Sequence, residues 1–418
     1  MALDSGLDVL NGQQSYKNPV GVGNQEYASG TNASTMGTQL RTDFYWKKAL
    51  IEAQREQYFT QMADVKSMPK HMGKTIKKYH FIPLLDDRNV STQGIDATGT
   101  VSTSAGSGAL YQGSKDVGTI SGKLPTLTEV GGRVNRVGFT RVTLEGTIEK
   151  FGFFDEFTQE SLDFDTDEEL YAHMQREMIM GANEMTEDAL QIDLLNGAGV
   201  EVFPGAATSK ATISGESGAV TEVSYDDLMR LAITLTDNRT PKQTRIITGT
   251  RLIDTKTIRG GWVMYVGSEM RPTLEKMTDY HSERAFVPVN QYAAGTTLLR
   301  GEIGSVGNFR IVEVPEMMHF EGDGAVITSE DATNYRDDGT NYNVYPMLVV
   351  GAESFTTIGF QTDGKMTKFK ITTKMPGEAT ADRTDPYGET GFSSIKWYYG
   401  SMILRSERIA VVYTVAEQ

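Results

Sequence analysis

Residues 166–196 read TDEELYAHMQREMIMGANEMTEDALQIDLLN and predict one long amphipathic helix in a chain otherwise typical of strands and Gly-rich loops. Thr166 and Glu169 form a capping box, and Gly197 follows the last residue. The predicted helix is roughly 45 Å long, so its apolar face needs a sheet or a neighbouring subunit to cover it. That face carries Leu170, Met174, Met178, Ala182, Met185, Ala189 and Ile192. The polar face carries Glu177, Glu184, Glu187, Asp188 and Gln191.

The composition limits the class of protein. The length of 418 residues is enough for about two or three domains, and the hydrophobic share of 39% is enough to form a core. The absence of cysteine excludes disulfides, thiolate metal sites and a cysteine nucleophile. The first residues lack a basic segment followed by an apolar run, so we expect no signal peptide. No stretch is apolar enough to predict a membrane-spanning helix.

The formal net charge of −15 bears on nucleic acid binding. Sequence-independent binding of DNA or RNA depends on Lys and Arg that neutralise phosphates, and this surface would mostly repel them. The charge therefore argues against tight, sequence-independent binding of DNA or RNA.

The N-terminal part divides into three predicted segments. Residues 1–41 are polar and rich in small residues, which predicts a flexible arm. Residues 43–62 predict a helix with Trp46, Ala49 and Leu50 on one side. Residues 75–85 then predict a strand.

Residues 86–136 are dominated by Gly, Ser, Thr and Asp, and a predicted strand lies on each side of this stretch. Between Arg141 and Glu149, apolar residues and glycine alternate with polar ones, which predicts a half-buried strand. We therefore expect residues 86–136 to leave the body as a long two-stranded excursion that rests on something else.

The chain after the long helix predicts a mixed α/β region. Ser224 and Asp227 form a second capping box before a short helix, and residues 321–343 predict a polar loop. No fixed-period repeat is present. Strands are expected at Arg245–Thr248, Phe309–Val314, Met347–Gly351, Lys368–Thr373, Ile395–Arg405 and Arg408–Tyr413.

No motif predicts a catalytic, cofactor-binding or metal-binding residue. The five histidines are scattered, and there is no Walker A or GxSxG sequence. Asp163, Asp165 and Asp167 imitate the start of an EF-hand loop, but Glu168 stands where that loop needs glycine. Three glycines of the excursion do not match the dinucleotide fingerprint: Gly106, Gly108 and Gly113. Paired carboxylates of a glycosidase could be present among the many acids, but nothing favours them.

Three stretches resemble a known family. Residues 67–79 read SMPKHMGKTIKKY, residues 385–400 read DPYGETGFSSIKWYYG and residues 402–410 read MILRSERIA. Together with the order of the predicted elements, they resemble major capsid proteins of tailed bacteriophages with the Hong Kong 97-type fold. The similarity is closest to the enquatrovirus-like podophages (Schitoviridae), and it covers most of the chain past residue 42.

The resemblance implies an α+β fold with a specific domain plan. Residues 1–85 would be the N-terminal arm and residues 86–136 the extended loop. Residues 137–223 would form a peripheral domain around the long helix. Residues 224–351 would form a mixed α/β axial domain, and residues 352–418 would return as strands that complete the core.

The resemblance further implies a protein without catalytic activity that self-assembles into hexamers and pentamers of an icosahedral head around double-stranded DNA. It would be made in the host bacterial cytoplasm and end in the virion. Its partners would be a separate scaffolding protein, a portal at one vertex and, in some relatives, a decoration protein, with no membrane. Lys115 and Lys123 lie in the loop that would hold the lysine of relatives that crosslink subunits, but nothing in the sequence identifies a partner for them. Separately from the resemblance, glycine is unfavourable within a helix, so we predict that Gly181 marks a bend or a close crossing. The alternatives are a phage tail or fibre protein and a carbohydrate-active enzyme.

Overall fold

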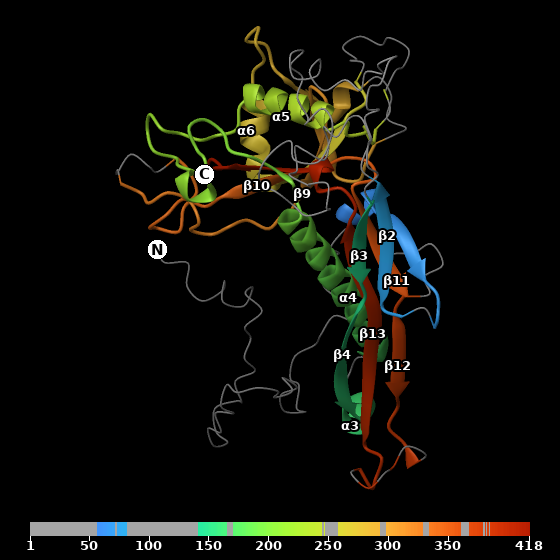
Figure 1. The fold of residues 1–418 in the computed structure, drawn as a ribbon. Coiled ribbons are helices and arrows are strands. Elements are labelled where there is room, and N and C mark those ends of the chain that lie inside the picture. The colour runs from blue at the N-terminus through green and yellow to red at the C-terminus, as the bar shows by residue number, and fades with distance from the viewer. Residues whose placement is uncertain are drawn as a thin grey trace, which may run out of the picture. The chain divides into compact units, whose positions relative to one another are not determined.

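The computed structural model describes most of the chain after residue 56 (Figure 1). The described residues are 57–71, 73–81, 141–164, 170–244, 246, 258–292, 298–328, 334–360, 368–378, 381, 383 and 385–418. The predicted arm at 1–41, residues 43–56 of the predicted helix at 43–62 and the excursion at 86–136 lie outside them. So does almost all of the strand predicted at Arg245–Thr248.

The described residues divide into two compact units. The smaller unit contains Phe154–Met178 and Thr372–Ser394, and the larger contains the remaining described chain. No helix of the described residues is long and apolar enough to cross a membrane.

One sheet has five strands and mixed direction. Its order is β1-β11-β13-β12, and β4 also pairs with β13. β1 runs parallel to β11, whereas β11 and β13 are antiparallel. An apolar cluster of Met68, Ile148, Ile358, Met402 and Leu404 packs here. The strands are β1 (Asp64–Met68), β4 (Glu149–Thr158), β11 (Phe355–Phe360), β12 (Lys370–Lys374) and β13 (Thr390–Ile403).

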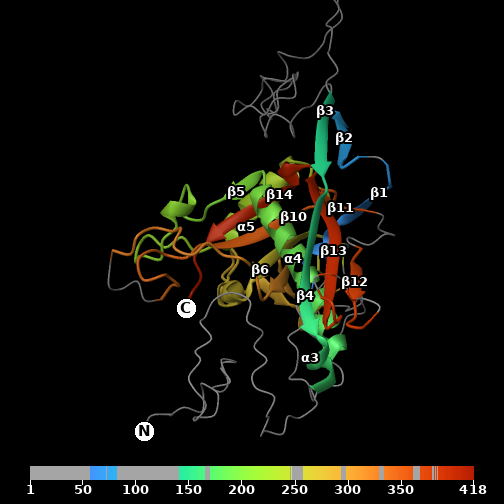
Figure 2. The same ribbon diagram turned by 90° about the horizontal axis from the view of Figure 1, so that it is seen from below.

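A second sheet has seven strands in the order β5-β14-β10-β6-β9-β8-β7, and Figure 2 shows part of it from below. Every residue of β6, β10 and β14 is buried, as expected for central strands covered on both faces. α5 (Tyr225–Asp237) packs Leu228 and Leu231 into the core beside this sheet. The strands are β5 (Val200–Val202), β6 (Trp262–Gly267), β7 (Phe286–Pro288), β8 (Glu302–Val306), β9 (Phe309–Val314), β10 (Tyr345–Val350) and β14 (Ile409–Thr414).

β2 (Thr75–Phe81) and β3 (Arg141–Thr147) form a two-stranded antiparallel ribbon. Phe81 pairs with Arg141, so the two strands that flank residues 82–140 are partners, as the flanking strand signals predict. The expected alternation is confirmed, with Leu144 half-buried and Gly146 and Ile148 buried. The single strand expected at Arg141–Glu149 is corrected to two, because β3 ends at Thr147 and β4 starts at Glu149.

The long helix is confirmed as α4 (Leu170–Asn196), while its predicted cap at Thr166–Glu169 lies outside the described residues. The predicted faces are partly wrong. Met185 is 51% exposed and Ile192 46% exposed, although both were assigned to the covered face. Glu187 and Gln191, assigned to the polar face, are buried. The reason is specific pairing, because Glu187 bonds the backbone of Phe59 and the Gln191 amide donates to Met317 Sδ at 3.1 Å.

Several smaller predictions are confirmed. The Ser224 side chain accepts from Asp227 N–H, which completes the capping box of α5. β9, β10, β12, β13 and β14 lie where strands were expected.

In place of the end of the predicted helix at 43–62, Phe59–Met62 form a 3-10 helix, η1. The other short helices are α3 (Gln159–Phe164), α6 (Arg271–Lys276), η2 (Lys210–Thr212), η3 (Ser268–Met270), η4 (Val289–Gln291) and η6 (Ser406–Arg408).

Candidate functional site

The described residues contain no group of three or more His, Asp or Glu side chains placed to hold a metal ion. His71 and His281 are exposed, His173 is half-buried, and His319 stacks on Tyr345 with ring centroids 5.1 Å apart. Asp163 is exposed, and Asp165 and Asp167 lie outside the described residues. The structure shows two other kinds of feature: contacts that hold particular chain segments in place, which we call anchors, and exposed surfaces.

The first anchor holds the segment that leads out of the N-terminal region. The backbone N–H of Phe59 donates to Glu187 Oε2 of α4 at 3.1 Å, and Gln57 Nε2 donates to Asn183 Oδ1 at 3.2 Å. The Phe59 ring packs on Tyr265 of β6, with centroids 4.7 Å apart, and Tyr265 OH donates to the Tyr58 carbonyl at 3.3 Å. One short segment thus contacts both α4 and the seven-stranded sheet.

The electrostatics of this anchor centre on a buried carboxyl group. Glu187 is 4% exposed. Burial raises its pKa, while hydrogen bonds from Thr60 and from the backbone of Tyr58 to Thr60 oppose that shift. Burial also raises the pKa of the Tyr265 phenol, and the Glu187 charge adds to the effect. A carboxylate at the start of η1 satisfies N–H groups that a helix leaves unpaired.

The same segment continues to the start of β8. Arg300 N–H donates to Gln61 Oε1 at 2.9 Å, and Gln61 Nε2 donates back to the Arg300 carbonyl at 3.3 Å. Deeper in this sheet, Arg310 of β9 forms a bidentate ion pair with Glu302 of β8, in which Nε lies 2.6 Å from Oε1. Their side chains are 2% and 0% exposed, and Tyr292 OH donates to the same carboxylate at 2.9 Å.

The second anchor is the base of the β2–β3 ribbon. A Cβ on Gly146 would lie 2.7 Å from Ile358 Cδ1 and 2.9 Å from Met402 Cβ, so only glycine lets β3 approach the sheet this closely. A Cβ on Gly400 of β13 would lie 2.2 Å from the Thr147 carbonyl oxygen. On the exposed face of the ribbon, the Arg141 guanidinium lies 4.1 Å over the Tyr79 ring.

A third feature is a turn at Asp385–Thr390. The Asp385 carboxylate accepts from Thr390 N–H at 2.8 Å, from the Thr390 hydroxyl at 2.5 Å and from Glu389 N–H at 3.1 Å. These hydrogen bonds, that of the Thr390 hydroxyl first, lower the pKa of Asp385. Gly388 adopts φ 66°, a conformation that suits glycine. The turn presents Tyr387 with 83% of its surface exposed.

Large apolar side chains also remain exposed on α4, where the sequence predicts burial, and on β4. Met185 and Ile192 lie on α4, and Phe154 on β4 is 63% exposed. Exposed aromatic and Met side chains are enriched at surfaces that bind proteins.

Sequence reasoning missed Glu187, Gln191, the Arg310–Glu302 pair and Asp385. The Asp-Pro-Tyr-Gly sequence carries a turn signal that could have found Asp385. Glu187 and Gln191 are paired across long sequence separations, and Arg310 and Glu302 are paired between neighbouring strands. No local pattern reports either kind of pairing. Lys115 and Lys123 lie outside the described residues. Among the described residues, a Cβ at Gly181 would meet only Phe153 Cζ at 3.8 Å, an ordinary contact, so no close crossing by the described part of the chain explains that glycine.

Comparison with known proteins gives consistent results. A family model described as phage capsid protein matches residues 141–413. The chain is similar to a major capsid protein of Pseudomonas phage KPP21, with 58% identity over 383 residues that cover 92% of this chain and 94% of that one.

Two solved structures share the fold at low identity. The capsid of Ralstonia phage GP4 matches with a TM-score of 0.55 and 12% identity, covering 93% of this chain and 99% of that one. The capsid of cyanophage P-SCSP1u matches with a TM-score of 0.50 and 11% identity, covering 92% and 96%. The expected α+β, Hong Kong 97-like fold is thereby confirmed. The chain belongs to the family of phage capsid proteins and is a major component of the virion shell.

Proposed function

We propose that this major capsid protein assembles into hexamers and pentamers of an icosahedral head that encloses double-stranded DNA. The observation that carries the proposal is the 58% identity to a phage major capsid protein over nearly the whole of both chains. Self-assembly also explains why the chain has anchored segments and exposed apolar side chains, since a shell subunit must bury its surfaces against identical copies.

The proposed division of labour follows the domain plan. Residues 1–85 act as an arm and residues 86–136 as an extended loop that lies over a neighbour in the same capsomer. Residues 137–223 form the peripheral domain, residues 224–351 the axial domain around the centre of each capsomer, and residues 352–418 complete the core. The two anchors support this plan. The first holds the described part of the arm, and the second holds the two strands that flank the extended loop.

The finer partners belong to the same proposal. A separate scaffolding protein guides assembly, a portal occupies one vertex, and a decoration protein is a further proposed partner. Packaged DNA is contacted weakly, which the net charge of −15 supports. Within the tailed phages, the stretches at 385–400 and 402–410 favour the enquatrovirus-like podophages. The chain carries no catalysis, as its structural relatives suggest, and the tail, fibre and carbohydrate-active alternatives are not favoured by them.

The test is to express the chain with and without the scaffolding candidate from its own phage and to image the products by cryo-electron microscopy. We expect closed shells with hexamers and pentamers when the scaffold is present. Rods, trimeric stalks or monomers alone, obtained under conditions that yield folded protein, would contradict the proposal.

A further inference from the structure

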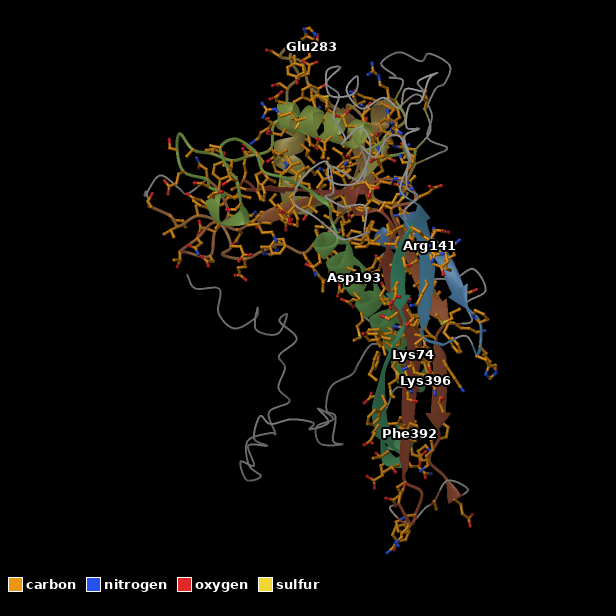
Figure 3. The ribbon with its side chains drawn as sticks, viewed as in Figure 1. Lys74, Arg141, Asp193, Glu283, Phe392 and Lys396 are labelled. Carbon is orange, nitrogen blue, oxygen red and sulfur yellow. The ribbon has the colours of Figure 1, made fainter. Side chains whose placement is uncertain are left out.

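One stretch of this acidic protein is strongly basic. Residues 57–81 contain five lysines against one aspartate, and we call Lys66, Lys70, Lys74, Lys77 and Lys78 the lysine strip. All five lysines are exposed, on β1, on β2 and on the turn between them. Lys74 lies at one end of the ribbon and Arg141 at the other (Figure 3).

Most of the lysine strip lacks a partner within the described part of the chain. Lys66 lies 3.2 Å from the Asp64 carboxylate, and Lys77 lies 2.5 Å from Glu145. No described carboxylate is within ion-pair distance of Lys70, Lys74 or Lys78. The strip therefore offers at least three positive charges to a partner.

A surface of opposite sign occurs on β4 and α3. Residues 151–164 contain four acids and no basic residue: Asp155, Glu156, Glu160 and Asp163, which we call the acidic segment. All four are exposed, and no described Lys, Arg or His lies within ion-pair distance of them. All four acids therefore lack an ion-pair partner among the described residues, as Lys70, Lys74 and Lys78 do.

A second observation, independent of charge, marks both surfaces. Phe154, directly before Asp155, is 63% exposed, and Tyr79, on the face of β2 that also carries Lys77, is 51% exposed with Arg141 over its ring. Exposed aromatic and Arg side chains are typical anchors of protein–protein contacts. Solvation alone explains the charges but not aromatic rings left in water at both places.

We propose that the lysine strip of one subunit binds the acidic segment of a second copy of this chain. The contact joins two different surfaces, so it is heterologous, and repeated heterologous contacts close into rings when the rotation allows. Such a contact suits a protein that assembles with identical copies. Nucleic acid fits the strip less well, because three free lysines on a chain of net charge −15 neutralise few phosphates.

Zero-length crosslinking of wild-type shells tests the contact directly. Shells assembled from mixed light and heavy-isotope subunits are treated with a carbodiimide, which joins a lysine to a carboxylate it touches. We expect crosslinks from Lys70, Lys74 or Lys78 to the acidic segment that connect light with heavy chains, and fewer of them in high salt. Crosslinks confined to single chains, to other carboxylates, or absent would overturn the proposal. The proposal would also be overturned if Lys70, Lys74 and Lys78 were protected from acetylation in DNA-filled shells but not in empty shells. Shells that form without these crosslinks would leave the proposed function intact.

Charge reversal gives an independent test. The triple variant K70E/K74E/K78E and the triple variant D155K/E160K/D163K should each lower shell yield by about tenfold or more, because like charges then face each other. Combining all six substitutions should restore most of the yield. Glu283→Lys, an exposed site outside both surfaces, is the matched control and should assemble normally. Folding of each variant is checked by circular dichroism. Normal assembly of a folded triple variant, or failure of the folded sixfold variant to recover, would overturn the charge pairing.

Discussion

The Glu187 carboxylate of α4 accepts a 3.1 Å hydrogen bond from the backbone N–H of Phe59, 128 residues earlier in the chain. A charged group with 4% exposure is costly, and here it is offset by N–H groups at the start of η1. This hydrogen bond attaches the first described residues of the chain to α4, the helix that the sequence predicts most clearly.

Glu187→Gln should keep an acceptor for the Phe59 N–H while removing a buried charge. We expect a free energy of unfolding at pH 7 equal to or above that of the wild type. Glu187→Ala leaves the N–H unpaired and should lower it by about 1–3 kcal/mol. Calorimetry of unassembled subunits measures both. Equal losses for the two variants would show that the charge itself is needed.

The pH dependence of Glu187 follows from the direction of its shift. Burial raises the pKa in the folded state above the ordinary 4.5, so the charged form is penalised only when the protein is folded. Stability contributed by this group should therefore increase as the pH falls from neutral through the raised pKa, and it should level off below the unfolded pKa. Glu187→Gln should abolish that part of the pH profile, and an unchanged profile in the variant would contradict the assignment.

Arg310→Met should destabilise the seven-stranded sheet by about 3–5 kcal/mol, because it leaves the Glu302 carboxylate buried and unpaired. The double variant with Glu302→Gln should recover part of the loss, since no charge then stays buried. Melting temperatures of the two variants and the wild type test whether the unpaired buried charge causes the loss of stability. A double variant less stable than Arg310→Met would refute the explanation by an unpaired charge.

Much of the fold is readable from local pattern, as particular elements illustrate. α4, α5 with its Ser224 cap, and β9 are predicted because capping residues and periodic apolar residues act within a few positions. The faces of α4 are predicted less well. The burial of Glu187 depends on Phe59 and that of Gln191 on Met317, and such distant pairs leave no periodic trace. Met185 and Ile192 depart from the prediction in the opposite direction. Both are apolar and fall on the face predicted to be buried, yet they are exposed in the described chain.

Gly146→Val should loosen the base of the β2–β3 ribbon. Its side chain would enter space occupied by Ile358 and Met402, and overpacking of this kind costs about 1–3 kcal/mol. Hydrogen exchange across Thr75–Phe81 should become faster, and shell yield should fall. Thr143→Val, on the exposed face of the same strand, is the control and should change neither.

Asp385→Ala should loosen the turn that presents Tyr387, because the carboxylate holds two backbone N–H groups and a hydroxyl. Amide exchange at Glu389 and Thr390 should accelerate in the variant. In the wild type, the lowered pKa means that the carboxylate's contribution is present above the ordinary 3.8 and is lost as the pH falls through the lowered value. Slow exchange of both amides in the variant would mean that Asp385 does not order the turn.

Gly181→Ala separates helix stability from shell geometry. Among the described residues, a Cβ at this position meets only Phe153, in an ordinary contact, so we expect the subunit to tolerate it and α4 to gain about 0.5–1 kcal/mol. If α4 must bend at Gly181 to serve capsomers of different curvature, the stiffer helix should yield fewer closed shells or shells of altered diameter although each subunit is more stable. Cryo-electron microscopy of shells and calorimetry of subunits measure the two effects separately. A more stable subunit that forms shells of normal size and yield would exclude bending at Gly181 as a requirement, and would leave the glycine without a structural role in assembly.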